Sequence, residues 1–147
     1  MQMNRNKEND ILETTLSIAE NAYSEADRFL LNAMERVQNQ GYHKIACGGF
    51  SAGCDMLLRA LAFSPAGCDL LLLQSPWITV LQEHAEAVVR AISQKNIALR
   101  IFCGAEDEDC LPLAEQLYAV TKQAGCKVTL TVQENTRHRF PAQLYHA

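Results

Sequence analysis

Residues 43–63, HKIACGGFSAGCDMLLRALAF, contain the pattern that decides the fold. Their first part is a short apolar run that ends in glycines, which predicts a buried strand over residues 43–49. Their second part has the composition of a helix. Between the two parts, residues 49–53 read GFSAG and fit the pattern G-x-S-x-G. A strand before this pattern and a helix after it predict a sharp turn that exposes the hydroxyl of Ser51.

The rest of the chain alternates between helical and strand patterns. Residues from about 10 to 40 carry apolar side chains at helical spacing and predict a helix, or two helices that break near residues 21–24. Further strands are expected near residues 69–74, 98–103 and 127–133, with helices near residues 80–94 and 111–125. This alternation predicts parallel strands joined by right-handed crossovers. We therefore expect one α/β domain over residues 1–147, a three-layer α/β/α fold with about four parallel strands.

Composition and charge exclude several classes of protein. Hydrophobic residues make up 48% of the 147 residues and charged residues 20%, which is typical of a globular domain. The formal net charge of −4 does not favour a nucleic-acid or anionic-membrane partner. No apolar run approaches the roughly 20 residues of a membrane span, and residues 1–13 are too polar for a signal peptide. We expect a cytoplasmic protein that binds neither nucleic acid nor membrane.

The six cysteines do not form a recognisable metal motif. None of them is spaced as C-x-x-C, and no paired histidine spacing accompanies them, so the sequence predicts no zinc site and no other metal or cofactor. Several fall in apolar runs, where cysteine usually behaves as a small buried side chain. The pattern suits a reducing compartment.

The turn at Ser51 has the features of a nucleophile site. Small residues at Gly49 and Gly53 would let the strand and the helix approach each other closely. The backbone N–H of Ala52, at the start of the helix, would point at a developing oxyanion. The alternative interpretation is that Ser51 only caps the helix, because G-x-S-x-G also occurs by chance.

A serine nucleophile needs a base and a carboxylate, and both follow in the chain order that this arrangement requires. The acidic run at residues 106–109 follows the third predicted strand, and His138 follows the fourth. His138 would take the serine proton, and Asp107 or Asp109 would hold the histidine tautomer. Four acidic residues in a row are also typical of a solvated loop, and a lone histidine is often only a surface residue.

Three short motifs resemble small bacterial esterase-like members of the α/β-hydrolase superfamily. They are GFSAG at residues 49–53, G-x-x-D at Gly104–Asp107 and H-x-F-P at His138–Pro141, and the similarity covers roughly residues 25–145. The G-x-x-D spacing favours Asp107 over Asp109 as the acid. The resemblance implies a serine hydrolase that cleaves a carboxylic ester or thioester of a small molecule through an acyl-enzyme intermediate.

The resemblance covers only the C-terminal half of that fold. The family has eight strands, and this sequence begins just before the fifth, so it does not contain the loop that donates the second oxyanion N–H. We therefore expect weak activity. The alternative is a non-catalytic remnant or interaction domain. The predicted strand at residues 43–49 would also become an apolar sheet edge, which predicts a homodimer because such edges recruit further strands.

Overall fold

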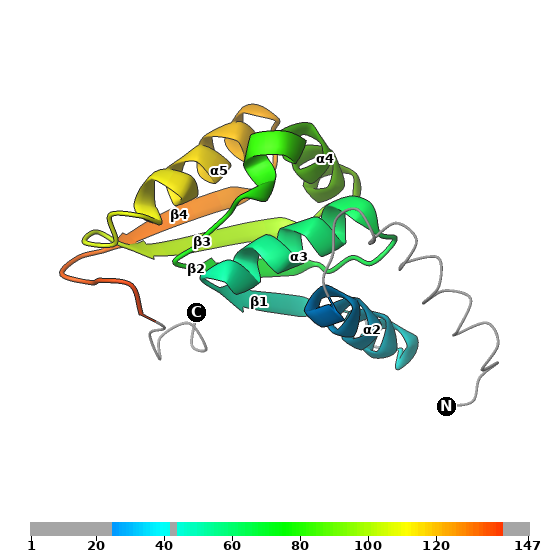
Figure 1. Cartoon of the computed structure of the whole chain (residues 1–147). Helices are drawn as coiled ribbons and strands as arrows, with labels where there is room; N and C mark the ends of the chain where they lie inside the picture. The colour runs from blue at the N-terminus through cyan, green and yellow to red at the C-terminus, as the bar shows by residue number, and fades with distance from the viewer. Residues whose placement is uncertain (1–24, 42–43, 140–147) are drawn as a thin grey trace.

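The computed structural model describes residues 25–41 and 44–139, in which helices and strands alternate along the chain (Figure 1). The helical prediction for residues 10–24 lies outside the described residues. The elements are α2 (Glu25–Asn39), β1 (Ala46–Phe50), α3 (Ala52–Phe63), β2 (Leu70–Gln74), α4 (Val80–Gln94), β3 (Ala98–Gly104), α5 (Leu111–Gln123) and β4 (Val128–Gln133).

The four strands form one parallel sheet in the order β1-β2-β3-β4. One row across the sheet aligns Cys47, Leu71, Leu99 and Val128. The predicted α/β class and the four parallel strands in sequence order are thus confirmed, and each strand begins within a few residues of its predicted start.

The described helices cover one face of the sheet. Figure 1 shows α3, α4 and α5 together on that face, and α2 packs against α3. When each right-handed crossover moves the chain one strand in the same direction, every crossover helix falls on the same face. The described residues therefore form two layers, and the second helical layer that we expected does not occur among them.

The hydrophobic core lies between this sheet face and the helices. The apolar strand side chains that point toward the helices are completely buried, such as Leu71, Leu73 and Ile101. They pack against side chains from all three crossover helices, and burial of each large aliphatic side chain contributes about 1.5–3 kcal/mol. On the opposite face, Arg100 and Thr129 are exposed. The core therefore fixes the strand ends that carry the candidate site, because it anchors each strand through alternate side chains.

None of the helices in the described part of the chain has both the length and the apolar character that a membrane span requires.

Candidate active site

Ser51 occupies a tight turn between β1 and α3. Its backbone has φ 55° and ψ −122°, a conformation that residues with a side chain rarely adopt and that costs on the order of 1–3 kcal/mol. Three backbone hydrogen bonds hold it. The Ser51 N–H donates to the Gln74 carbonyl at 3.0 Å, and the Ser51 carbonyl accepts from the N–H groups of Cys54 and Trp77, each at 3.1 Å. The turn is therefore fixed by β2, by α3 and by the loop after β2.

The two glycines of the GFSAG motif differ in what they contribute. A Cβ atom on Gly49 would lie 2.9 Å from Leu57 Cδ1 and 3.1 Å from the Cys54 nitrogen, so glycine lets β1 and α3 approach this closely without displacing either group. A Cβ atom on Gly53 would meet no atom within 4 Å. The expectation that both glycines allow a close approach therefore holds for Gly49 alone.

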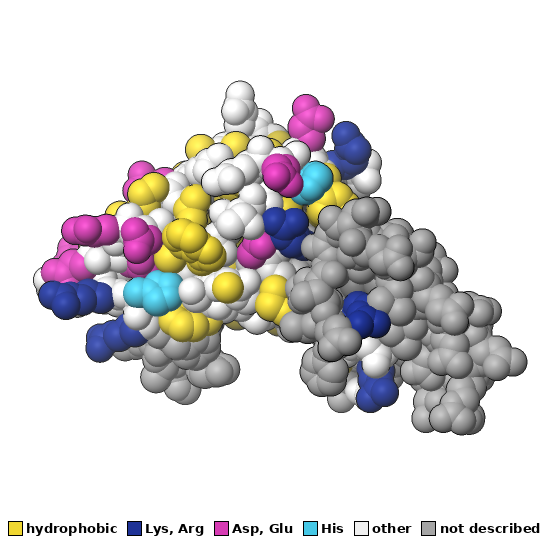
Figure 2. Space-filling model, in the orientation of Figure 1, with side chains coloured by type: hydrophobic (Ala, Val, Ile, Leu, Met, Phe, Trp, Pro, Cys, Tyr) yellow, Lys and Arg dark blue, Asp and Glu magenta, His cyan; other side chains and the backbone are white. Residues whose placement is uncertain are grey.

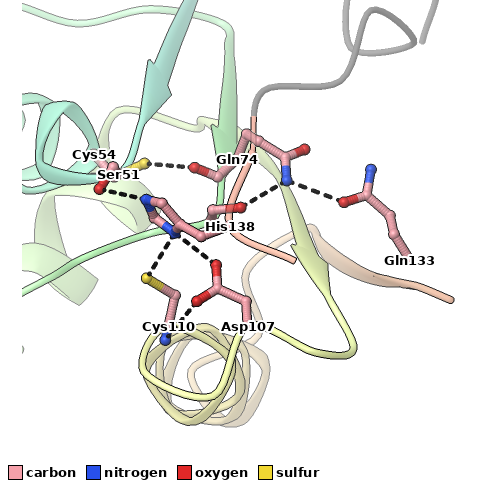
Figure 3. Close-up of polar contacts among 8 residues, drawn as sticks. Ser51, Cys54, Gln74, Asp107, Cys110, Gln133 and His138 are labelled. Atoms are coloured by element: carbon pink, nitrogen blue, oxygen red, sulfur yellow. Dashed lines mark hydrogen bonds and ion pairs between the residues drawn. The ribbon is translucent and has the colours of Figure 1, made fainter. Parts of the chain in front are cut away.

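His138 connects Ser51 with the acidic loop (Figure 3). Its Nε2 lies 3.0 Å from Ser51 Oγ, and its Nδ1 lies 2.7 Å from Asp107 Oδ2. An ionised carboxylate only accepts hydrogen bonds, so Nδ1 carries the proton and Nε2 presents its lone pair to the serine hydroxyl. In this tautomer His138 can act as a base toward Ser51. The side chain of His138 is 41% exposed and that of Asp107 only 4%.

Asp107, rather than Asp109, has its carboxylate against the histidine. Asp107 lies between β3 and α5, and its Oδ1 accepts a hydrogen bond from the Cys110 N–H at 3.3 Å. A negative charge just before a helix is also favoured by the helix dipole. The side chain of Asp109 is exposed.

The loop that carries Asp107 is bound to the loop that carries His138. The Glu106 N–H donates to the Thr136 carbonyl at 2.9 Å. A Cβ atom on Gly104 would collide with this carbonyl group, so glycine at the end of β3 is required for the two loops to cross. The spacing from Gly104 to Asp107 therefore has a structural reason, because the glycine lets the second loop pass over the first.

Two neighbours of His138 were not identified from the sequence. The Phe50 ring lies 5.0 Å from the His138 ring, centroid to centroid, with an interplanar angle of 34°. Cys110 Sγ lies 3.5 Å from His138 Nδ1. Burial raises the pKa of the Cys110 thiol to about 12, and the charge of Asp107 contributes. The only sequence signal for Cys110 is its position three residues after Asp107, about one helical turn away.

The loop after β2 is held beside the serine by Asp55. Asp55 Oδ1 accepts hydrogen bonds from the N–H groups of Thr79 and Val80, each at 2.8 Å, and Arg59 forms an ion pair with its Oδ2 at 2.8 Å. This fixes the start of α4 against α3. The loop between β2 and α4 carries Trp77, which is 46% exposed. The sequence did not predict this role of Asp55.

Ala52 is the first residue of α3. Its N–H belongs to the first turn of the helix, where N–H groups have no acceptor within the helix. The helix dipole adds positive potential there. An oxygen that develops negative charge beside Ser51 could therefore accept a hydrogen bond from Ala52. Its side chain is exposed.

Comparison with known proteins identifies the fold of the chain. No family model and no curated protein matches this sequence. Among solved structures, an uncharacterized protein from Bacillus cereus ATCC 10987 is 24% identical with a TM-score of 0.73, covering 82% of this chain and 39% of that one. Esterase PE8 is 18% identical with a TM-score of 0.66, covering 90% of this chain and 61% of that one. SOBER1 from Arabidopsis thaliana is 15% identical with a TM-score of 0.62, covering 83% of this chain and 59% of that one.

At these identities the likeness is one of fold. Esterase PE8 and SOBER1 have the α/β-hydrolase fold, so the chain has part of that fold, as its motifs predicted. It spans 39–61% of the length of these three structures.

Proposed function

We propose that this chain is a serine hydrolase that cleaves a carboxylic ester or thioester of a small molecule. The observation that carries the proposal is the position of the His138 ring, with Nε2 3.0 Å from Ser51 Oγ and Nδ1 2.7 Å from Asp107 Oδ2. These distances lie within hydrogen-bond reach of a nucleophile and its base. The strained backbone of Ser51 supports the proposal, because strain of this kind concentrates at functional turns.

In the proposed reaction, His138 Nε2 removes the hydroxyl proton as Ser51 Oγ attacks the acyl carbon. The carbonyl oxygen becomes negatively charged and accepts a hydrogen bond from the Ala52 N–H. The tetrahedral intermediate then collapses, the bond to the leaving group breaks, and the alcohol or thiol takes the proton from His138. A water molecule, deprotonated by His138, then attacks the acyl carbon. The bond to Ser51 Oγ breaks, Oγ takes the proton back from His138, and the carboxylic acid leaves. Asp107 stabilises the imidazolium at both stages.

We propose further that turnover by these 147 residues is slow. Ala52 is the one oxyanion donor that we assign, and loss of one donor costs about 10²–10³ in rate. The exposed side of His138 should lower the rate further, because water weakens the electrostatic interactions on which catalysis depends.

Two further proposals concern the assembly of the chain and its location in the cell. We propose a homodimer that pairs through β1, because β1 is an edge strand in the described part of the chain and its Ala46 and Gly48 are exposed. Sedimentation equilibrium should give twice the monomer mass, and a monomer at micromolar concentration would refute this. We also propose a cytoplasmic location, because all six cysteines are free thiols.

Labelling with a fluorophosphonate probe tests the hydrolase proposal without knowledge of the substrate. We expect the wild-type chain to be labelled at Ser51 and to release a burst of product from an activated aryl ester, whereas Ser51→Ala should show neither. If the two proteins are labelled and hydrolyse equally, Ser51 is not a nucleophile. The chain would then be a non-catalytic remnant or interaction domain.

A further inference from the structure

Asp107, Cys110 and His138 bring three potential metal ligands together. Cys110 Sγ lies 3.5 Å from His138 Nδ1, and the same Nδ1 lies 2.7 Å from Asp107 Oδ2. One ligand atom from each residue lies within 4.8 Å of the others. A thiolate, an imidazole and a carboxylate are the donors that zinc takes in proteins. Figure 3 shows that Asp107 and Cys110 both approach the Nδ1 side of the ring, away from Ser51.

The spacing between these atoms suits tetrahedral zinc. With Zn–S of about 2.3 Å and Zn–N of about 2.0–2.1 Å, a tetrahedral site separates sulfur and nitrogen by about 3.5 Å. Cys110 Sγ and His138 Nδ1 already have this separation. The nitrogen and carboxylate oxygen of such a site would be about 3.4 Å apart. The Asp107 oxygen would therefore need to withdraw by about 0.7 Å, a movement that a side-chain rotation provides.

A cation has a route to this position. An open depression of about 590 Å³ borders it, lined by Ala105, Glu106, Asp107, Glu108, Asp109, Arg137 and His138. Four carboxylates and one guanidinium line this depression, so its field attracts divalent cations. Figure 2 shows acidic side chains gathered on the surface at the end of the molecule where β3 and β4 finish, with basic side chains beside them.

The proposed reaction has no use for the Cys110 thiol. The side chain is 1% exposed, yet its sulfur contacts the ring nitrogen that also receives Asp107. Among the other cysteines, Cys47 and Cys126 are half-buried and the remaining three are buried like Cys110. The Cys110 sulfur is thus a soft ligand placed beside the nitrogen that sets the histidine tautomer.

We propose that Zn²⁺ binds to Cys110 Sγ, His138 Nδ1 and the Asp107 carboxylate, with water as the fourth ligand, and that it inhibits the hydrolase. Binding releases the Cys110 thiol proton to solvent, because a coordinated thiol is deprotonated. The metal takes the Nδ1 lone pair, so the ring proton moves to Nε2 through solvent. Nε2 then donates to Ser51 Oγ and has no lone pair with which to accept its proton. The inhibitory part rests on the proposed function, whereas the binding part does not.

Calorimetric titration with zinc chloride tests the binding part in a protein that needs no activity. The Ser51→Ala chain should bind one zinc ion at this site, and the Ser51→Ala/Cys110→Ser chain should bind it more weakly. Loss of a residue that merely supports a metal ligand costs about 10–100-fold in affinity, so loss of the thiolate should cost at least about 10-fold. Cobalt(II) gives a second measurement, since a thiolate-to-cobalt charge-transfer band should appear with Cys110 and not with serine.

Hydrolysis of p-nitrophenyl acetate tests the inhibitory part, with each rate divided by that of the same variant without zinc. Wild type and a Cys126→Ser control should lose activity at the same zinc concentration, and Cys110→Ser should need at least about 10-fold more. EDTA should restore the rate. Equal zinc affinity with and without the Cys110 thiol would overturn the site. Unchanged hydrolysis by the zinc-saturated protein would overturn the inhibition. If the chain binds zinc but never hydrolyses the ester, the proposed function has failed and the metal site has not.

Discussion

Replacing Gly104 with alanine tests how the ends of β3 and β4 bring the histidine to the serine. The new Cβ atom would collide with the Thr136 carbonyl group and lie 2.8 Å from the Arg137 oxygen, whereas ordinary contact begins at 3.4 Å. Both opposing groups are backbone, so they cannot rotate away. The segment that leads to His138 must therefore shift by about 1 Å, roughly the overlap that has to be relieved.

This shift should reduce both activity and stability. His138 lies two residues after Thr136, and its Nε2 is only 3.0 Å from Ser51 Oγ. A displacement of about 1 Å takes this pair out of the range of about 2.6–3.2 Å, and a misplacement of that size can cost about 10²-fold in rate. Overpacking of this kind costs about 1–3 kcal/mol of folding free energy. At roughly 2–4 °C per kcal/mol for a chain of this size, the midpoint of thermal unfolding should fall by about 2–12 °C.

The assay pairs the rate of fluorophosphonate labelling with thermal unfolding, and Gly53→Ala is the matched control. Gly53 lies in the GFSAG motif, but a Cβ atom there meets nothing within 4 Å. In helix α3 alanine should raise stability by up to about 1 kcal/mol and leave labelling within a few-fold of wild type. If Gly104→Ala matched Gly53→Ala in both measurements, the crossing of the two loops at Gly104 would not position His138.

Two further predictions concern the acid and the buried thiol. Asp107→Asn should lower the rate of ester hydrolysis by up to about 10⁴-fold, because an amide can stabilise the wrong histidine tautomer. The exposed Asp109→Asn should leave the rate within a few-fold, and the reverse order would assign the acid to Asp109. Burial raises the pKa of Cys110 to about 12, so on the order of one Cys110 thiol in 10⁴ is ionised at pH 8. A cysteine with the ordinary pKa of about 8.5 would be about one-quarter ionised at that pH. Iodoacetamide should therefore alkylate Cys110 far more slowly in the native chain than in urea, as mass spectrometry of the tryptic peptides would show, and equal rates would contradict the burial.

Local patterns in the sequence were enough to predict the strands and their order. An apolar run bounded by glycine, such as residues 43–49, encodes a buried strand through neighbouring residues alone. Alternation of such runs with helical stretches then implies parallel pairing. The proximity of Ser51, Asp107 and His138 was also within reach of the sequence, because each follows a strand and parallel strands end at the same edge.

The tertiary structure decided what depends on direction and on contacts across the fold. Asp107 and Asp109 stand in the same acidic run, and only the path of the chain into α5 turns the carboxylate of Asp107 toward His138. The sequence predicted no metal site, because the ligand spacing along the chain is not that of a zinc motif, and the zinc site that we propose depends on tertiary contacts alone. Cys110 meets His138 across 28 positions of sequence, since the end of β4 lies beside the end of β3. The single helical layer of the described residues likewise follows from the sheet order, in which every crossover moves in the same direction.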